Sequence, residues 1–273
     1  MNHNPLVSII VTTYNRKELL KETIDSITNQ TFEHFELIII DNFSDYDFFK
    51  YVASFKDSRI RPYQNRNNGI IAVNRNYGIR KAKGKYIAFC DDDDIWFPKK
   101  LEKQINLLKN TQNHIVFTMR KQFGETSIFS KYFGIGPLSF TVNTSTRALL
   151  QKNCIALSSV MIEKEIMDRI GFFNEKKSYI AIEDYDLWIR VSQVTRIEFI
   201  PEVLILHRVH KSNIYENMSN INEGLKEMKI SYGVVSNLKA KEKIKQNPIY
   251  YFIRNLFYFS YEKLFNKSIY SLK

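Results

Sequence analysis

YIAFCDDDDIWFP, residues 86–98, joins a short apolar run to four consecutive aspartates, an aromatic pair and a proline. Neighbouring carboxylates repel one another, and burying them is costly unless they are paired or bind a cation. An apolar strand that ends in this way predicts either a solvated acidic loop or a metal site. The rest of the chain decides between the two.

The composition indicates a chain that can form a sizeable core, since 44% of its 273 residues are hydrophobic. The N-terminus lacks the basic and apolar regions of a signal peptide, and no stretch approaches the length of a membrane span. The two cysteines, Cys90 and Cys154, lie far apart without metal-ligand spacing. They predict free thiols and a reducing cytoplasm.

The net charge of +11 predicts an anionic partner, such as phosphates, anionic lipid or nucleic acid. Residues 226–273 contain ten Lys and Arg against three Asp and Glu, so much of the excess lies at the C-terminus. We expect no nucleic-acid partner, because no recognition motif is present and acidic strand ends would repel phosphates without a metal.

Strands and helices alternate over the first 110 residues. Apolar runs predict strands at 7–11, 36–40, 59–64 and 85–90, and helical spacing predicts helices at 16–29, at 70–82 closed by Gly84, and at 98–109 opened by Pro98. This alternation predicts an α/β fold with a mostly parallel sheet and helices on both faces. Ligands bind beyond the carboxyl ends of such strands, where Asp41 and residues 91–94 are expected.

The second half is less regular. Residues 111–153 predict a loop region that lines a pocket, followed by a strand at 155–162, a helix at 183–194 and two short strands around Pro201 within 196–210. From about residue 217 the pattern is helical, basic and aromatic. Its segments 239–245 and 249–265 favour either an interfacial helix on anionic lipid or a helix packed on the core, and both stay open.

The place of the aspartate run favours a metal site over a solvated loop. Clustered carboxylate oxygens suit Mg²⁺ or Mn²⁺, which are commonly shared between one or two carboxylates and a substrate phosphate. Because successive strand residues point in opposite directions, Asp91 and Asp93 are expected to share a side that Asp92 does not.

Four segments resemble the ordered motifs of the family-two inverting glycosyltransferases with the GT-A fold. They are VSIIVTTYNR (7–16), ELIIIDN (36–42), NNGIIAVNRNYGIRKAKGKYIAFCDDDDIWFP (67–98) and GFFNEKKSYIAIEDYDLWIR (171–190). The resemblance covers residues 5 to about 210. It implies a GT-A, Rossmann-like catalytic domain over residues 1–215, with a nucleotide-binding half (1–110) and an acceptor-binding half (111–215). A helical, basic and aromatic extension (216–273) would follow it.

The resemblance also implies a nucleotide-sugar donor, most often UDP-linked, and a divalent cation, Mn²⁺ or Mg²⁺, held by a D-x-D pair. The residues it assigns to the donor are Thr13, Tyr14, Asn15, Asp41, Arg75, Asp91 and Asp92, and those it assigns to the metal are Asp93, Asp91 and His210. Asp41 would accept a hydrogen bond from the base. His207, in the same HRVH element as His210, is the alternative histidine. Asn42 and Phe43 depart from the family, where aspartate and glycine are common.

The second acidic element is IEDYD, residues 182–186. Acidic residues in a first helical turn complement the helix dipole, which is one interpretation of Glu183 and Asp184. The resemblance implies instead that Asp184 is the general base and that Glu183 orients the acceptor. An acceptor hydroxyl must lose its proton as it attacks the anomeric carbon opposite the diphosphate, so the displacement is direct and inverting. Trp188 is interpreted as core or pocket wall, and Asp186 as structural.

The sequence therefore predicts an inverting glycosyltransferase that moves a sugar from a nucleotide-sugar to a hydroxyl of a glycan or lipid-linked saccharide. The resemblance places it in bacterial surface-glycan assembly, such as lipopolysaccharide or capsule, in the cytoplasm or peripherally on the inner face of the cell membrane. The alternative is a catalytically inactive donor-binding or membrane-associated scaffold, against which the intact IEDYD argues. A sugar nucleotidyltransferase is disfavoured because VTTYNR lacks a glycine-rich loop.

Overall fold

The computed structural model describes residues 4–111, 113–124, 142–210 and 218–234. The strands in this part of the chain are β1 (Val7–Thr13), β2 (Phe35–Asp41), β3 (Ile60–Gln64), β4 (Tyr86–Asp91), β5 (Ile95–Trp96), β6 (Ile115–Gly124), β7 (Met161–Glu163) and β8 (Ile197–Val209). The helices described are α1 (Lys17–Thr28), α2 (Phe48–Ala53), α3 (Ile71–Lys81), α4 (Lys100–Asn110), α6 (Thr146–Gln151), α7 (Lys164–Ile170), α8 (Glu183–Ser192) and α9 (Met218–Ser231), with 3-10 turns at Leu157–Ser159 and Lys177–Tyr179.

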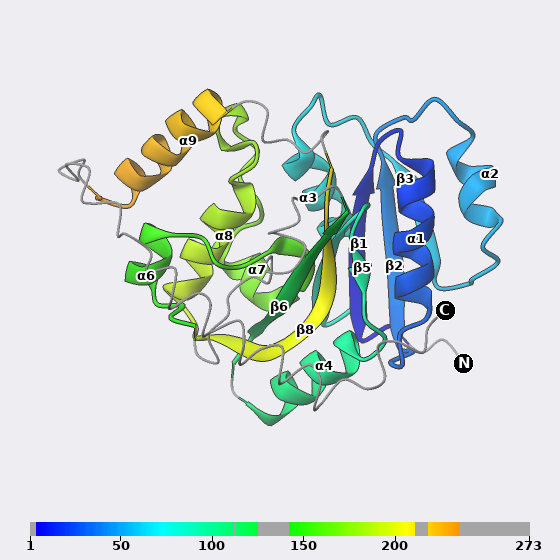
Figure 1. The fold of residues 1–273 in the computed structure, drawn as a ribbon, viewed down its shortest axis with the longest axis horizontal. Coiled ribbons are helices and arrows are strands. Elements are labelled where there is room, and N and C mark those ends of the chain that lie inside the picture. Colours follow the sequence, from blue (N-terminus) through cyan, green and yellow to red (C-terminus); the bar gives the residue numbers. More distant parts are fainter. Residues whose placement is uncertain (1–3, 112, 125–141, 211–217, 235–273) are drawn as a thin grey trace. The chain divides into compact units, whose positions relative to one another are not determined.

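The described strands form one sheet in the order β3-β2-β1-β4-β7-β6-β8-β5 (Figure 1). Strands β3, β2, β1 and β4 run parallel, and β6 runs parallel to β8. The pairs β4–β7, β7–β6 and β8–β5 are antiparallel. The predicted α/β architecture, a mostly parallel sheet flanked by helices, is confirmed.

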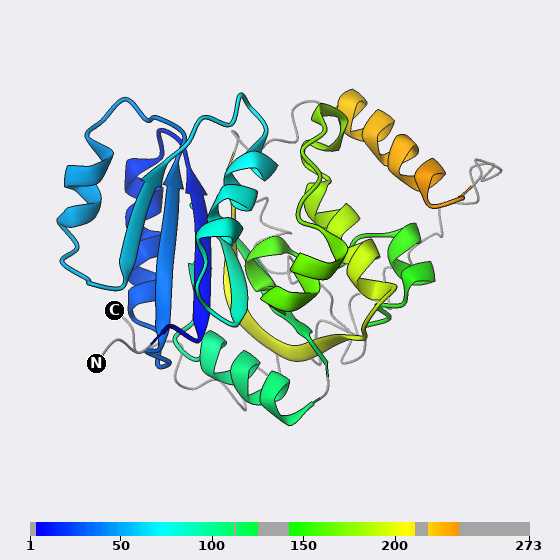
Figure 2. The ribbon, with the colours of Figure 1, turned by 180° about the vertical axis from the view of Figure 1, so that it is seen from behind.

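Strand β1 lies between two apolar layers. Its residues Ile9 and Val11 belong to a core cluster that includes the buried faces of α1 and α4, whereas Ile10 belongs to a second cluster with α3. Figures 1 and 2, seen from opposite sides, show α1 and α3 on opposite faces of the sheet. A continuous apolar run such as VSIIV is what a strand buried on both faces requires.

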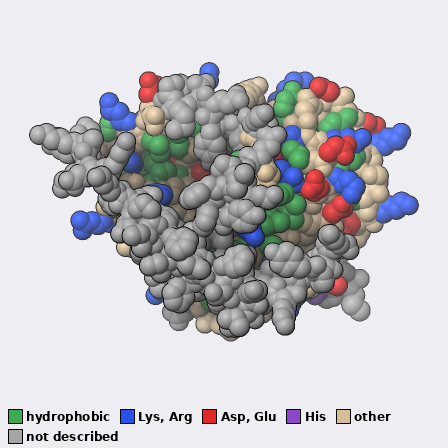
Figure 3. All heavy atoms as spheres, viewed as in Figure 1, with side chains coloured by type: hydrophobic (Ala, Val, Ile, Leu, Met, Phe, Trp, Pro, Cys, Tyr) green, Lys and Arg blue, Asp and Glu red, His purple; other side chains and the backbone are tan. Residues whose placement is uncertain are grey.

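Acidic and basic side chains are interspersed over α1 and α2, on the right of the face in Figure 3. Helix α1 shows how this arises, because Leu20, Ile24 and Ile27 are buried while Lys21 and Asp25 form an exposed i,i+4 ion pair. The apolar stripe thus faces the sheet and the charges face water.

Residues 111–153 contain more regular structure than predicted. The segment 115–124 is strand β6, and residues 146–151 form helix α6, whereas 125–141 lie outside the described residues. The polar second half of β6 gave no strand signal in the sequence. Its pairing with β8 along the whole length supplies the hydrogen bonds that stabilise it.

Two strand predictions in the second half were wrong in extent. Within 155–162, residues 157–159 form a 3-10 turn and the strand begins only at Met161. Within 196–210, one strand, β8, runs through Pro201 instead of breaking there. The register to β6 shifts on both sides of Met119, near this proline, and such an irregularity accommodates a residue that has no N–H to donate.

Helix α9 packs against the 3-10 turn at Lys177–Tyr179. Gly224 makes this approach possible, since a Cβ there would lie 2.0 Å from the Ser178 carbonyl oxygen. The described residues up to Tyr232 belong to one compact unit. The predicted boundary at 215/216 stays a prediction, and segments 239–245 and 249–265 lie outside the described residues. No helix among those described has the length and apolar character needed to cross a bilayer.

Helix α3 ends at Lys81 with Ala82 as its cap, so Gly84 does not close it as predicted. Gly84 instead lies against β1, where its N–H donates to Ser8 Oγ (2.8 Å). A Cβ at this position would lie 2.6 Å from the backbone nitrogen of Ser8. The strand could not move away without losing its pairing to β4.

Replacement Gly84→Ala is therefore expected to lower the free energy of unfolding by about 1–3 kcal/mol, the usual cost of overpacking. Urea denaturation followed by circular dichroism measures it. Lys83→Ala, at the exposed neighbouring position, is the matched control and should unfold as the wild type does. Equal stability of the two variants would contradict the close approach.

Candidate active site

A cavity of about 320 Å³ lies at the carboxyl end of β4. Its walls come from the loop after β1, helix α3, the aspartate run, strand β6, the segment before β7, the start of α8 and the end of β8. Six carboxyl groups and four guanidinium groups line it: Asp91, Asp92, Asp93, Asp94, Glu183 and Asp184, with Arg16, Arg75, Arg120 and Arg208. Carboxylates are in excess, so the site favours additional cations.

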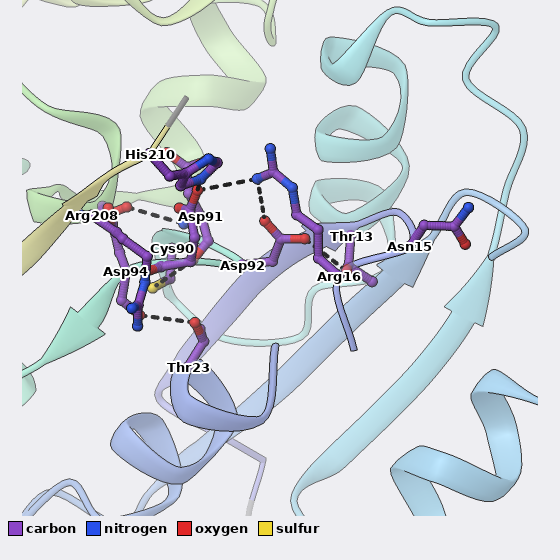
Figure 4. Close-up of polar contacts among 12 residues, drawn as sticks. Thr13, Asn15, Arg16, Thr23, Cys90, Asp91, Asp92, Asp94, Arg208 and His210 are labelled. Carbon is purple, nitrogen blue, oxygen red and sulfur yellow. Dashed lines mark hydrogen bonds and ion pairs between the residues drawn. The ribbon is translucent and has the colours of Figure 1, made fainter. Parts of the chain in front are cut away.

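Arg16 holds the middle of the aspartate run. Its Nη1 lies 3.1 Å from an oxygen of Asp92 and 3.1 Å from one of Asp93 (Figure 4). Thr13 donates its hydroxyl to the other oxygen of Asp92 at 2.7 Å. Asp93 also contacts His210, whose Nε2 lies 2.8 Å from the same oxygen that Arg16 contacts.

Asp91 faces a different partner from Asp93. Strand β4 ends at Asp91, and the N–H of Asp94 donates to the Asp91 carbonyl (3.2 Å), which closes a turn. The expectation that Asp92 would not share a side with Asp93 was wrong, because strand alternation stops where this turn begins, and Asp91, Asp92 and Asp93 all line the cavity. Asp92 and Asp93 share Arg16, whereas Asp91 accepts a hydrogen bond from Arg75 at 2.9 Å.

The fourth aspartate, Asp94, is committed to bonds within the protein. It is 1% exposed, accepts the N–H of Arg208 at 3.0 Å and contacts His207 Nδ1. Its carbonyl accepts the hydroxyl of Thr23 on α1 at 2.9 Å. Asp94 thus ties the turn to β8 and to α1, and it is a structural residue.

Arg75 links the aspartate run to helix α8. The residue is 6% exposed, and its two terminal nitrogens pair with Asp91 and with Glu183 at the start of α8. Burial alone would lower its pKa, but Glu183, Asp91 and Asp184 raise it overall, so the guanidinium stays charged. The second oxygen of Glu183, Oε2, is buried without a hydrogen-bond partner in the described structure.

Asp184 is half-buried beside Glu183 and lines the cavity. One of its oxygens accepts the N–H of Tyr185 at 2.6 Å. Burial raises the pKa of Asp184 to about 7, the charge of Glu183 adds to the rise, and Arg75 opposes it. A carboxyl group with a pKa near neutrality can take up a proton at neutral pH.

Burial also raises the pKa values of Asp91 and Asp92 to about 6, and the charges of Arg75 and Arg16 respectively limit the rise. For His207, burial acts against protonation, but the hydrogen bond and charge of Asp94 raise its pKa overall, while Arg120 opposes them. These carboxylates are thus held close together at an electrostatic cost.

The donor set fits a divalent cation that also binds a ligand. Among the described residues, no three His, Cys, Asp or Glu side chains form a ready metal site. Asp93 and His210 nevertheless present an oxygen and a nitrogen 2.8 Å apart, and the lining carries excess negative charge. Mg²⁺ and Mn²⁺ sites in phosphate enzymes commonly use one or two protein ligands, with phosphate and water completing the shell.

Four predicted donor-binding residues do not line this cavity: Thr13, which contacts it only through its hydrogen bond to Asp92, and Tyr14, Asn15 and Asp41. Tyr14 is 52% exposed. The side chain of Asn15 points away from the aspartate run (Figure 4) and donates to Asp45 at 2.8 Å. Asp41 is fully buried and accepts hydrogen bonds from the Ser44 N–H and hydroxyl and from Gln64 (2.9 Å). These contacts join the loop after β1 to the loop after β2, and the end of β2 to the end of β3.

The structure adds residues that sequence reasoning missed. Arg16 is the last residue of the VTTYNR segment, so the sequence could have placed it in the site, directly after β1. Its pairing with Asp92 and Asp93 could not have been predicted from the sequence. Ser158, whose hydroxyl accepts the Asp91 N–H at 3.0 Å, lay in a segment predicted as strand. Arg120 gave no signal, because β6 was not predicted. Trp188 is fully buried in the core, as one of the two interpretations held.

Solved structures share this fold. S. aureus TarS residues 1–349, in complex with UDP-GlcNAc, superposes with a TM-score of 0.61 at 18% identity, over 76% of this chain and 59% of that TarS fragment. The mannosyltransferase PcManGT from Pyrobaculum calidifontis, in complex with GDP-Man and Mn²⁺, gives 0.61 at 17% identity, over 85% of this chain and 65% of PcManGT. At such identities the likeness establishes the GT-A fold alone.

Sequence relatives are closer. A rickettsial protein (Rickettsia felis) described as an uncharacterized glycosyltransferase is 32% identical over 80% of this chain, which spans 36% of that relative's length. The Escherichia coli UDP-Glc:alpha-D-GlcNAc-diphosphoundecaprenol beta-1,3-glucosyltransferase WfaP is 32% identical over 78% of this chain and 80% of its own length. The model of Glycosyl transferase family 2 matches residues 8–163. By this match and these relatives, the chain belongs to glycosyltransferase family 2.

Proposed function

We propose that the protein is an inverting glycosyltransferase that moves a sugar from a nucleotide-sugar donor to a hydroxyl of a glycan or lipid-linked saccharide. One observation carries the proposal: the acid-tipped end of β4 and the acidic start of α8 face one cavity and are joined by Arg75. This arrangement supports a site in which the aspartate run would bind the phosphates of a substrate and α8 would supply the proton acceptor.

The donor would lie along residues 1–110. Thr13 and Asp41 are the last residues of β1 and β2, and Tyr14 and Asn15 directly follow β1. Because β4, which ends in the aspartate run, pairs with β1 in parallel, this place suits a nucleoside whose diphosphate reaches that run. Because Asp41 is already held by Ser44 and Gln64, contact with a base would require one of these bonds to open or Asp41 to accept a further donor. Family membership and WfaP, named for UDP-Glc, support a UDP-sugar.

A divalent cation, Mn²⁺ or Mg²⁺, would be held by Asp93, with Asp91 and His210 as the remaining protein ligands. Bound there, it would neutralise negative charge on the departing diphosphate. Asp92 stays paired with Thr13 and Arg16 in this arrangement, which positions the turn. The complex of the fold relative PcManGT with Mn²⁺ supports the choice of metal.

Asp184 would act as general base. Its pKa of about 7 leaves it largely ionised at slightly alkaline pH yet basic enough to accept a proton from an acceptor hydroxyl. Attack on the face of the sugar opposite the diphosphate then gives inversion. Glu183 would orient the acceptor, because its unpartnered Oε2 is a buried acceptor that a sugar hydroxyl can satisfy.

The acceptor would bind residues 111–215, where the segment before β7 and the start of α8 form the far walls of the cavity. WfaP is named for a diphosphoundecaprenol-linked acceptor, which supports a lipid-linked saccharide for this chain. A role in surface-glycan assembly follows from that acceptor class. Peripheral contact of residues 216–273 with an anionic membrane stays a prediction.

Asp184→Asn is expected to lower kcat by about 10²- to 10⁴-fold, because the variant cannot accept a proton. Donor binding and thermal stability should be retained. Because burial raises the pKa of Asp184 to about 7, its ionisation lowers folding stability progressively above roughly pH 4 and in full above about pH 7, and asparagine removes that cost. Product formation from UDP-glucose, by mass spectrometry, and donor titration measure the two effects.

Asp186→Asn is the structural comparison, since it loses bonds to Arg190 and Tyr232 and should lower Tm. Normal transfer by Asp184→Asn would overturn the base assignment.

The pH dependence of kcat/KM should report the same group. Since the base must be ionised, kcat/KM is expected to rise with pH and level off above about 7, near the pKa of Asp184. Asp184→Glu, which keeps a carboxylate, should shift the midpoint. A profile that is flat between pH 5.5 and 8.5 in the wild type, or a midpoint unmoved in Asp184→Glu, would contradict the assignment.

Asp93→Ala should abolish the part of UDP binding that depends on Mn²⁺. Calorimetric titration with UDP, in Mn²⁺ and in EDTA, measures that part as the difference in affinity. Wild type and variant are expected to bind equally in EDTA. Asp168→Ala removes an exposed carboxylate on α7 and is the control. If Asp93→Ala binds UDP with the full Mn²⁺ enhancement, Asp93 is not a ligand.

A further inference from the structure

The four arginines of the cavity differ in their partners. Three of them pair with carboxylates: Arg16 with Asp92 and Asp93 (both 3.1 Å), Arg75 with Asp91 (2.9 Å) and Glu183, and Arg208 with Glu22 (2.7 Å). The guanidinium of Arg120 has neither a hydrogen bond nor an ion pair to any of the described residues. Its guanidinium is therefore the cavity cation whose charge is not already offset by a bound carboxylate.

Arg120 is also built into the fold. It is half-buried on strand β6, directly after the buried Met119, and its backbone is paired with Ile205 of β8. A side chain carried by a paired strand is positioned more firmly than one on a loop. Arg120 lines the same cavity as His207 and the aspartate run, which is the proposed phosphate-binding end.

Partial burial without a partner costs a guanidinium part of its hydration, which a ligand can restore. Its planar fork of N–H groups matches the oxygens of a phosphate and can bind them bidentately. We propose that Arg120 binds a phosphate or pyrophosphate oxyanion of a substrate. This inference rests on the proposed function, which supplies two sources of that chemistry: the diphosphate of the donor and the diphosphate that links an acceptor to its lipid.

Calorimetric titrations of Arg120→Met and Arg120→Lys distinguish these sources. One arm titrates UDP with Mg²⁺, and the other titrates geranyl diphosphate into enzyme saturated with UDP and Mg²⁺. Loss of a charge-assisted hydrogen bond should weaken one of the two by about tenfold in Arg120→Met. Weaker UDP binding assigns Arg120 to the donor, and weaker geranyl diphosphate binding assigns it to the acceptor. Arg120→Lys should fall between, because it keeps the charge but loses the fork.

Arg196→Met is the matched control, since Arg196 is an exposed guanidinium whose side chain is 78% accessible and paired only to Glu198 at 3.5 Å. It should bind both probes as the wild type does. If Arg120→Met and Arg120→Lys also bind both probes as the wild type does, the inference is overturned and the proposed function stands. A wild type that binds neither probe would overturn both.

A measurement on the unchanged protein covers the case in which Arg120→Met fails to fold. Phenylglyoxal modifies accessible guanidinium groups, and peptide mass spectrometry locates the modified residue. Arg120 is expected to react in the free enzyme and to be protected by UDP or by geranyl diphosphate, while Arg196 reacts in every condition. Modification of Arg120 that neither probe reduces would overturn the proposal.

Discussion

The site depends on one buried ion-pair bridge, in which Arg75 joins Asp91 at the end of β4 to Glu183 at the start of α8. These two carboxylates lie 92 residues apart in the sequence, so the bridge joins the parallel half of the sheet to the helix of the second half. A buried pair of this kind adds little net stability, but removing one partner leaves an uncompensated charge and is strongly destabilising. The bridge therefore fixes the geometry of the cavity, and with it the spacing between the aspartate run and Asp184.

Much of the fold followed from the sequence because its signals were local. Continuous apolar runs marked β1, β2 and β4, and helical spacing marked α1, α3 and α8, each within one or two residues of its observed bounds. Strand β6 was missed because its second half, RKQF, has a polar pattern that only pairing with β8 stabilises. Strand β8 was predicted as two strands on either side of Pro201, because the sequence could not show the register shift that accommodates a proline.

The candidate site, like the fold, could be predicted from the sequence only where its signals are local. The acidic ends of β4 and α8 could be located, since motif order and strand ends are properties of the sequence. The partner of each carboxylate could not, because Arg16 and Arg75 reach the aspartate run from separate elements and Arg120 lies on the unpredicted strand. Where a chain turns sharply, as after Asp91, side-chain direction depends on the turn itself, and the alternation rule no longer applies.

The hydrogen bonds of Asp94 within the protein have a consequence for how related sequences are aligned. In a run of four aspartates, a D-x-D pattern fits the first and third letters as well as the second and fourth. The carboxylate of Asp94 contacts the Arg208 N–H and His207, and its carbonyl accepts the hydroxyl of Thr23. Asp93, in contrast, contacts His210. Only the first of the two frames leaves Asp94 out, and an alignment shifted by one letter would equate this structural carboxylate with Asp93, the proposed metal ligand.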